Sequence, residues 1–312
     1  MTAPAIEVSA LCKQYGPVAA VDHISFTVKP GELVGFLGLN GAGKTTTLRI
    51  LTTFMPASSG VARVAGFDVM YQSMEVRKHL GYLPESVPLY PEMRVDEYLT
   101  ARAKLKQVDR SVRTARIEDC LAKCRIREVR KRLIGTLSKG YRQRVGLADT
   151  LLADPAVLLL DEPLSGLDPQ QQNETLNTIK GLSGQHTVLF SSHQLSDVEK
   201  VCDRVIIIHR GKIAFDDRLT AFDTRTVTVT VEVKANASDA VKVFSAVAGV
   251  DRAAAADDDD GWVVVNLESQ YTKDVREAVA RKAFEKGWGL RRLVRKQERL
   301  EEMFMRVAYQ RV

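Results

Sequence analysis

A glycine-rich segment at residues 38–45 carries the clearest chemical signal in the sequence. It reads Gly-Leu-Asn-Gly-Ala-Gly-Lys-Thr, which fits the phosphate-binding pattern G-x-x-x-x-G-K-[ST]. Glycines let the backbone curve so that successive N–H groups point at phosphate oxygens, and a following helix adds its N-terminal dipole. Lys44 is expected to reach the β- and γ-phosphates, and the Thr45 hydroxyl to ligate Mg²⁺. The nucleotide-binding candidates are Gly38, Asn40, Gly41, Ala42, Gly43, Lys44, Thr45 and Thr46.

Two adjacent carboxylates follow the apolar run Val157–Leu160, which is typical of a strand buried on both faces. Asp161 would end that strand at its carboxyl edge, where it can hold Mg²⁺ beside bound phosphates. Glu162, one residue on, can orient or deprotonate an attacking water. An acidic pair at a strand end is, taken alone, as often an exposed turn or a helix cap. Together with the glycine-rich segment, it predicts transfer of a phosphoryl group to water.

A third segment, Leu-Ser-Lys-Gly-Tyr-Arg-Gln-Arg at residues 137–144, resembles the signature sequence of ATP-binding cassette (ABC) ATPases, usually LSGGQ followed by a basic residue. The resemblance covers about residues 6–219, with the motifs in the family's order and spacing. It implies ATP hydrolysis by a sandwich dimer, in which each ATP lies between one subunit's glycine-rich loop and the other's signature. The residues that match the remaining family positions are Ser138 and Gly140 of the signature, Asp168 of the D-loop, the switch histidine His193 and the adenine-stacking Tyr15.

Two places depart from the family pattern. Lys139 and Tyr141 replace the usual Gly and Gln of the signature. Glu85 stands where most relatives carry the Q-loop Gln, which contacts Mg²⁺ and couples the site to the transmembrane partner. Glu85 is therefore a candidate Mg²⁺ ligand that adds a negative charge. Such a Glu is similar to the ABC-2-type exporter ATPases, including gliding-motility-like and multidrug-type members, and Leu-Glu-Glu-Met-Phe at residues 300–304 also resembles that branch.

The pattern of apolar runs predicts two domains. Residues 1–219 alternate buried-type strands with helices, which favours an α/β fold around a parallel sheet. The resemblance makes them a P-loop ABC ATP-binding domain with a mixed sheet and a helical subdomain at about residues 86–150. Strands are expected at residues 6–11, 24–28, 33–37, 157–160, 187–191 and 205–209, and helices at 44–54 and within 96–132.

Residues 220–312 are expected to form a small α+β accessory domain. Its predicted strands are 226–233, a short one before a loop at Asp257–Gly261, 262–267 and 290–294. Helices are predicted at 238–248, 272–286 and 300–309. The order βαββαβ plus a helix predicts a ferredoxin-like sandwich.

Composition narrows the functional class. Apolar residues make up 45% of the 312 residues and charged residues 27%, as in ordinary globular proteins. No apolar run approaches the length of about 20 residues that a spanning helix needs. The N-terminus lacks a secretory-signal pattern, and the four cysteines are too few and scattered for a disulfide framework, so a cytoplasmic setting is expected.

Charge and family resemblance together suggest the partners. Lys and Arg number 45 against 39 Asp and Glu, and the excess lies in residues 101–132 and 281–312. The favoured interpretation is the ATPase subunit of an exporter, bound to transmembrane permease subunits at the cytoplasmic face of the membrane and paired with a second ATP-binding subunit. The alternatives are an importer ATPase, a soluble ABC ATPase acting on ribosomes or DNA, and a structural or regulatory protein. No aromatic-interleaved basic patch is present, so nucleic acid is not an expected partner.

Overall fold

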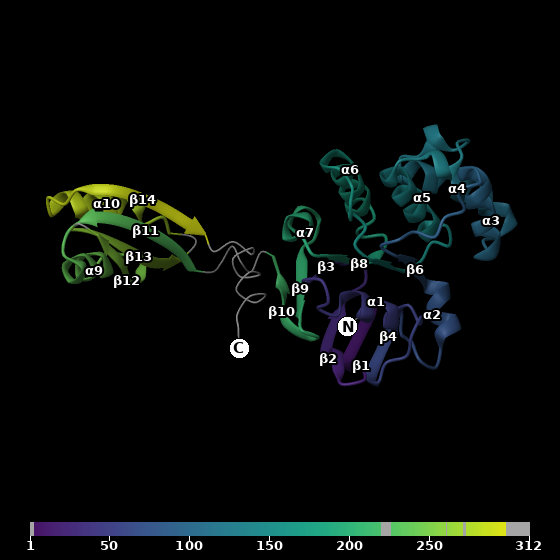
Figure 1. The fold of residues 1–312 in the computed structure, drawn as a ribbon, viewed down its shortest axis with the longest axis horizontal. Helices are drawn as coiled ribbons and strands as arrows, with labels where there is room; N and C mark the ends of the chain where they lie inside the picture. Colours follow the sequence, from purple (N-terminus) through teal and green to yellow (C-terminus); the bar gives the residue numbers. More distant parts are fainter. Residues whose placement is uncertain (1–2, 220–225, 260, 271–272, 298–312) are drawn as a thin grey trace. The chain divides into compact units, whose positions relative to one another are not determined.

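The chain folds into two compact units, residues 1–217 and residues 218–312, in a computed structural model. The structure describes residues 3–219, 226–259, 261–270 and 273–297 (Figure 1). Each unit has its own hydrophobic core. The predicted helix at 300–309 and the segment at 300–304 lie outside the described residues.

A six-stranded sheet forms the centre of the first unit. Its strand order is β10-β9-β3-β8-β7-β6, and the five strands from β9 to β6 are parallel to one another. The continuous apolar runs predict strands covered on both faces, and every residue of β3, β7 and β8 is buried. The strands are β3 (Leu33–Leu37), β6 (Leu80–Leu83), β7 (Val157–Leu160), β8 (Thr187–Ser192), β9 (Arg204–His209) and β10 (Lys212–Arg218).

A second, antiparallel sheet packs below the first, with the order β2-β1-β4-β5. Its strands are β1 (Ile6–Tyr15), β2 (Val18–Val28), β4 (Ser59–Val64) and β5 (Phe67–Asp68). Helix α1 (Lys44–Leu51) lies between the two sheets (Figure 1), and its Leu48 and Leu51 join Ile6 of β1 and Phe36 of β3 in one buried cluster. Helix α1 therefore packs against both sheets.

The remaining helices of the first unit lie on the opposite side of the six-stranded sheet, apart from α2 (Ser73–His79), which precedes β6 (Figure 1). Between β6 and β7 the chain forms a helical region. Its helices are α3 (Val95–Leu105), α4 (Arg110–Lys123) and α5 (Lys139–Leu151), with 3₁₀ turns at Arg127–Val129 and Ile134–Thr136. Helices α6 (Pro169–Lys180) and α7 (Leu195–Val201) follow β7 and β8.

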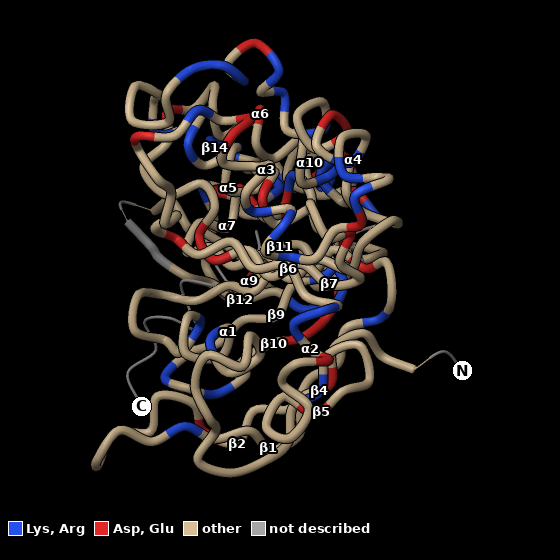
Figure 2. Tube along the Cα trace, turned by 90° about the vertical axis from the view of Figure 1, so that its right-hand side faces the viewer, with Lys and Arg blue, Asp and Glu red and all other residues tan. Residues whose placement is uncertain are grey.

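Much of the basic charge in this helical region is paired with acidic side chains. Figure 2 marks both signs of charge on the trace around α4. Arg116 contacts Asp154 at 2.9 Å, and Arg130 contacts Glu118 at 2.7 Å. These exposed pairs add little stability, about 0–1 kcal/mol each.

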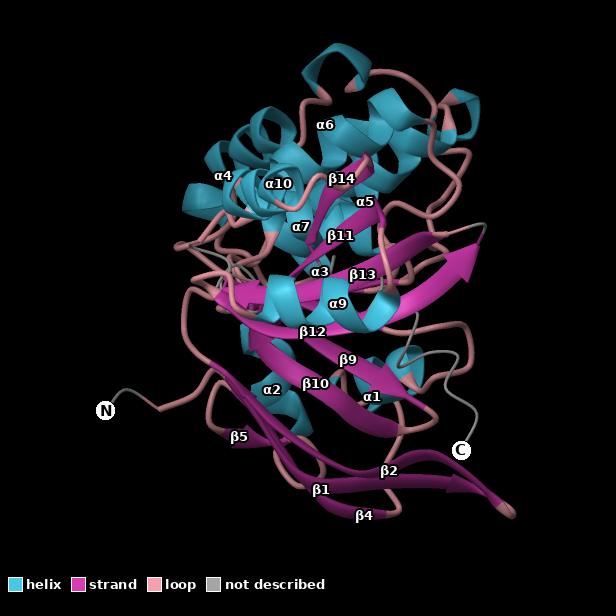
Figure 3. Ribbon diagram, turned by 90° about the vertical axis from the view of Figure 1, so that its left-hand side faces the viewer, coloured by secondary structure: helices cyan, strands magenta, loops and turns pink. Residues whose placement is uncertain are grey.

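The second unit is an antiparallel sheet, β12-β13-β11-β14, with two helices on one face. Figure 3 shows α9 lying across the strands. The elements are β11 (Thr226–Lys234), α9 (Ala237–Ser245), β12 (Val250–Asp259), β13 (Trp262–Gln270), α10 (Arg276–Glu285) and β14 (Leu290–Gln297). The strict alternation of β11 buries Val227, Val229, Val231 and Val233.

The predicted loop at Asp257–Gly261 is wrong in its extent. Asp257 to Asp259 belong to β12 and pair in register with Val264, Val263 and Trp262 of β13. Aspartate is a poor strand former, but the hydrogen-bonding ladder of the neighbouring strand overrides that preference. Gly261, directly before β13, is in a turn conformation.

Phe244 is expected to carry a large share of the second unit's stability. Its side chain is fully buried and meets the Trp288 ring edge-on, with 5.8 Å between ring centroids. Phe244→Ala should lower the free energy of unfolding by about 3–5 kcal/mol. The measurement is urea unfolding followed by tryptophan fluorescence, because both tryptophans, Trp262 and Trp288, lie in this unit.

Phe284→Ala is the matched control. That side chain lies on α10 and is 72% exposed, so its removal should change the free energy of unfolding by less than about 0.5 kcal/mol. Equal midpoints for the two variants would contradict this assignment of the core.

Candidate functional site

The glycine-rich loop joins β3 to α1 in the conformation that its sequence predicts. Gly41 and Gly43 have φ values of 79° and 113°, in the left-handed region that favours glycine. A Cβ atom at Gly43 would lie 2.5 Å from the Ala20 carbonyl oxygen, and one at Gly38 would lie 2.5 Å from that of Ile208. The close approach of neighbouring backbone therefore requires glycine at residues 38 and 43.

Lys44 is buried at the first position of α1. Its ammonium Nζ donates to the carbonyl oxygen of Gly38 at 2.6 Å and to that of Leu39 at 3.3 Å. It also lies 3.1 Å from Oε1 of Glu162. The loop thus wraps around the ammonium group, which is held against the carboxylate at the end of β7.

Asp161 is held at the carboxyl edge of the parallel sheet by neighbouring hydroxyls. Ser191 Oγ donates to its Oδ1 at 2.8 Å, and Thr45 Oγ1 donates to the same oxygen at 3.3 Å. Burial raises the pKa of Asp161 above its ordinary value, and the two hydroxyl hydrogen bonds oppose that rise. Tyr82 OH lies 3.5 Å from Oδ2, and burial next to this carboxylate raises the pKa of Tyr82 to about 12.

Glu162 is buried and its two carboxylate oxygens face different partners. Oε1 makes the contact with Lys44, while Oε2 lies 2.8 Å from Nδ1 of His193. Its backbone N–H donates to Ser191 Oγ at 2.9 Å, and its φ of 46° is unusual for a residue other than glycine. Such a backbone conformation costs about 1–3 kcal/mol and is concentrated at functional sites.

A cavity of about 240 Å³ is bordered by Lys44, Thr45, Glu162 and His193. Ser165 Oγ, on its rim, donates to Oε1 of Glu85 at 3.3 Å. The predicted residues that line the cavity are Asn40, Gly41, Gly43, Lys44, Thr45, Thr46, Glu85, Glu162 and His193. Gly38 and Ala42 belong to the same loop, and Asp161 lies behind Thr45 through their hydrogen bond.

Four other predicted residues belong neither to this lining nor to the loop and carboxylate pair beside it. Ser138 caps the N-terminus of α5 by accepting from the Tyr141 N–H at 3.3 Å, and Asp168 caps α6 by accepting from the Gln171 N–H at 2.9 Å. Gly140 packs so closely on Gln171 that a Cβ atom would lie 2.1 Å from its Oε1. Tyr15 is half exposed at the end of β1, and its hydroxyl lies 3.2 Å from Met55 Sδ.

Ser191 is a site residue that motif reasoning did not single out. Its fully buried hydroxyl bridges the two carboxylate residues, because it donates to Asp161 and accepts from the Glu162 N–H. The sequence feature that indicates its role is its position near the end of a buried strand, two residues before His193.

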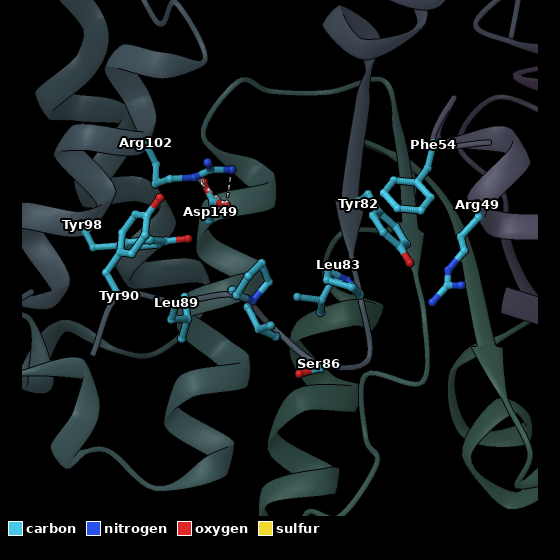
Figure 4. A pocket seen from close by; sticks show the side chains of 14 residues that line it. Arg49, Phe54, Tyr82, Leu83, Ser86, Leu89, Tyr90, Tyr98, Arg102 and Asp149 are labelled. Carbon is cyan, nitrogen blue, oxygen red and sulfur yellow. Dashed lines mark hydrogen bonds and ion pairs between the residues drawn. The ribbon is translucent and has the colours of Figure 1, made fainter. Parts of the chain in front are cut away.

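A second cavity, of about 590 Å³, lies between the sheet and the helical region. Figure 4 shows Phe54, Tyr82 and Arg49 along one wall and Tyr90, Tyr98 and Arg102 along the other. Arg102 is held by Asp149 of α5, with Nη2 and Oδ2 3.0 Å apart. The remaining lining residues are Leu83, Pro84, Ser86, Val87, Pro88, Leu89 and Gly146. The cavity is therefore aromatic along its walls, with an arginine on each side.

The sequence and the fold both match known proteins. The family model described as "ABC transporter" matches residues 21–165. The ABC transporter ATP-binding protein NatA of Bacillus subtilis (strain 168) is 41% identical over 200 residues, which cover 64% of this chain and 81% of NatA. The chain belongs to the ATP-binding subunits of ABC transporters. Its enzymatic activity is accordingly ATP hydrolysis, and the predicted family and activity are confirmed.

Further relatives agree with this family. The linearmycin resistance ATP-binding protein LnrL of Bacillus subtilis (strain 168) is 34% identical over 202 residues, 64% of this chain and 65% of LnrL. A solved ATP-binding subunit of an ABC transporter superposes with a TM-score of 0.64 at 27% identity, covering 70% of this chain and 91% of that one. Among the residues that the structure describes, no helix is long and apolar enough to cross a bilayer.

Removal of the Ser191 hydroxyl should weaken both the fold and the activity of this ATPase. Ser191→Ala leaves the buried Glu162 N–H without its acceptor and removes one of the two donors to Asp161 Oδ1, which costs about 1–3 kcal/mol of stability. We expect the ATPase rate to fall by about tenfold, with the loss appearing in kcat, because both carboxylate residues lose a positioning contact.

Ser192→Ala is the neighbouring control, since the Ser192 hydroxyl accepts from the Gln194 N–H at 3.0 Å and so bonds to Gln194 rather than to Asp161 or Glu162. A Ser191→Ala enzyme with the kcat of the control would show that the bridge does not position the carboxylates.

Proposed function

We propose that this chain is the ATP-hydrolysing subunit of an ABC-2-type exporter, working as a nucleotide-sandwich dimer with separate transmembrane permease subunits at the cytoplasmic face of the membrane. The observation that carries the ATPase chemistry is the contact series from Lys44 to Glu162 to His193 within one cavity. The exporter assignment is supported by Glu85 at the Q-loop position and by the name of LnrL, because resistance to a toxic compound fits its removal from the cell.

In this proposal Glu162 is the general base. Its carboxylate lies on the cavity beside Lys44, so it can accept a proton from water that attacks the γ-phosphate of ATP. His193 holds the second carboxylate oxygen and fixes the orientation of the first. Lys44 and the N–H groups of the loop bind the phosphate oxygens, and Lys44 offsets the charge that develops on them.

The donor set at the cavity fits a magnesium ion. Mg²⁺ prefers hard oxygen ligands, usually one or two carboxylates with phosphate and water, and the Thr45 hydroxyl and the Asp161 carboxylate meet at 3.3 Å. Thr45 and Asp161 would hold the ion, with Glu85 as an additional ligand across the cavity. When bound, the ion neutralises negative charge on the phosphates.

The placement of the signature favours a site completed by a second copy of the chain. Ser138, Gly140 and Asp168 do not line the cavity that holds Lys44 and Glu162. The N-terminus of α5, capped by Ser138, is a suitable site for a phosphate group supplied by another subunit. Tyr15 would stack on the adenine of ATP bound to its own subunit. A homodimer is the proposed arrangement.

The second cavity is the proposed docking site for the permease. Its two walls come from different elements, with Arg49 on α1 and Tyr98 and Arg102 on α3. Pro84 and Ser86 line this cavity, whereas Glu85 between them lines the nucleotide cavity. A protein segment bound here would therefore press on both neighbours of a candidate Mg²⁺ ligand, which gives a physical route between transport and hydrolysis.

The second unit is proposed to be a ferredoxin-like sandwich. Its element order and the strand order β12-β13-β11-β14 support this fold, because both crossovers place helices on one face of an antiparallel sheet. We propose domains at residues 1–219 and 220–312, with the helical subdomain at about 86–150. A role of the accessory domain in dimer contacts or regulation is part of the proposal.

Glu162→Gln should abolish most hydrolysis while preserving ATP binding. The amide keeps the shape of the side chain but is not a base, so we expect the ATPase rate to fall by at least about 100-fold. The variant should also accumulate as an ATP-bound dimer. Phosphate release and light scattering with and without MgATP measure the two effects.

Glu174→Gln is the matched control for this substitution. Glu174 pairs with Arg144 at 3.1 Å and lies outside the nucleotide cavity, so its rate should stay near that of the unmodified protein. Hydrolysis by Glu162→Gln at the unmodified rate would exclude Glu162 as the base.

Phe54→Asp should disrupt permease docking without disturbing the fold. Phe54 is 73% exposed on the wall of the second cavity, and a carboxylate there removes apolar contact area. Tagged protein from gently solubilised native membranes should co-purify with a polytopic membrane protein, and Phe54→Asp should lose it while retaining ATP hydrolysis.

Tyr71→Asp, at an 88% exposed aromatic outside the cavity, is the control. Recovery of ribosomes or nucleic acid with no membrane protein would overturn the exporter proposal.

A further inference from the structure

Three metal-binding side chains meet on the antiparallel sheet, away from the catalytic carboxylates. Cys12 lies on β1, and Asp22 and His23 lie on β2. One sulfur, one carboxylate oxygen and one ring nitrogen from these residues all lie within 4.8 Å of one another. We propose that Cys12, Asp22 and His23 form a binding site for a transition-metal ion of the Zn²⁺ class.

An irregularity in strand pairing brings the three groups together. Leu11 pairs with Ile24 and Lys13 pairs with Val21, so Cys12 alone stands opposite both Asp22 and His23. This β-bulge interrupts the pairing of β1 with β2, the two long neighbouring strands that Figure 3 shows. Bulges redirect side chains at functional sites. His23 has a φ of 50°, so a bulky residue occupies a left-handed conformation where glycine would be less strained.

The contacts within the group are compatible with metal ligation. The His23 N–H donates to Cys12 Sγ at 3.2 Å. His23 Nδ1 lies 2.7 Å from Asp22 Oδ1. Tetrahedral Zn²⁺ with ordinary bond lengths places such N and O ligands about 3.4 Å apart. The observed separation is shorter than this, so ion binding requires the exposed His23 and half-buried Asp22 side chains to move apart.

The donor types select the class of metal. A thiolate and an imidazole are soft and borderline ligands, which favour Zn²⁺ or Co²⁺ over Mg²⁺ or Ca²⁺. Three protein ligands leave a fourth position for water, and His23, with 72% of its side chain exposed, opens the site to solvent. On binding, the Cys12 S–H bond is replaced by an S–metal bond and one proton is released to solvent. This chemistry distinguishes the site from the all-oxygen set at Thr45 and Asp161.

One neighbouring charge opposes a cation and gives the proposal a sharp test. Lys212 Nζ lies 3.3 Å from Asp22 Oδ2 and is 70% exposed. Its ammonium competes with a metal ion for the carboxylate, so its removal should tighten metal binding. Damage to the fold would act in the opposite direction.

The site is also close to the nucleotide loop through the backbone. The Asp22 N–H donates to the Gly211 carbonyl oxygen at 2.8 Å, and the Gly211 N–H donates to that of Ala42 at 2.9 Å. A bound ion would brace the part of β2 that packs against the glycine-rich loop. The inference does not depend on the exporter proposal, because it concerns metal binding by the isolated chain.

The experiment is a titration of the full-length chain, freed of any histidine tag, with Zn²⁺ against a chromophoric chelator and with Co²⁺ by absorption. We expect one ion per chain and a thiolate-to-Co²⁺ charge-transfer band. Cys12→Ser retains an acceptor for the His23 N–H but removes the soft ligand, so affinity should fall by more than about 100-fold and the band should vanish. His23→Ala should also weaken binding.

Two further variants complete the test. Cys202→Ser, at a buried cysteine outside this group, should leave affinity unchanged. Lys212→Met should tighten binding several-fold, because a cation next to the site is removed. Absence of stoichiometric binding by the unmodified chain, or equal affinity in Cys12→Ser, would overturn the proposal.

Discussion

Burial of two adjacent carboxylates at the edge of a parallel sheet is the constraint on which the first unit depends. An ionised carboxylate taken out of water is costly unless it is paired and hydrogen-bonded. Asp161 receives two hydroxyl hydrogen bonds, and Glu162 contacts a buried ammonium and an imidazole. Those partners come from the start of α1, which follows β3, and from the end of β8 and the residue after it. The sheet order that places β3 beside β8 and β8 beside β7 therefore brings together the groups that stabilise the buried carboxylates.

The same constraint explains why the glycine-rich loop has so little freedom. Lys44 begins α1, and α1 is packed between two sheets by Leu48 and Leu51. The loop closes over the Lys44 ammonium through the Gly38 and Leu39 carbonyls. A small displacement of α1 would thus move the ammonium relative to Glu162. Because Arg49 of the same helix lines the second cavity, the proposed docking site acts on a rigid element that also carries the chemistry.

Local sequence patterns predicted the parts of the site that lie within single segments. The loop at residues 38–45, the strand ending at Asp161 and the helix beginning at Lys44 depend on nearest neighbours and on buried apolar runs. The bridge made by Ser191 was not predictable, because it depends on which strand lies beside β7. The group at Cys12, Asp22 and His23 has the same origin, since a pairing shift between two strands creates it. The extension of β12 through Asp257–Asp259 likewise follows from the neighbouring ladder rather than from residue type.

In the proposed dimer, a second copy of the chain completes each ATP site. A mixing experiment in the Glu162→Gln background tests it, with Lys44→Ala added to one chain and Ser138→Arg added to another. Each modified protein alone should retain no ATP, because every site lacks either its loop or its signature. Each mixed dimer should retain one ATP, since one of its two sites combines an intact loop with an intact signature. A mixture that retains none, or full retention by Ser138→Arg alone, would show that the two halves of an ATP site do not come from different chains.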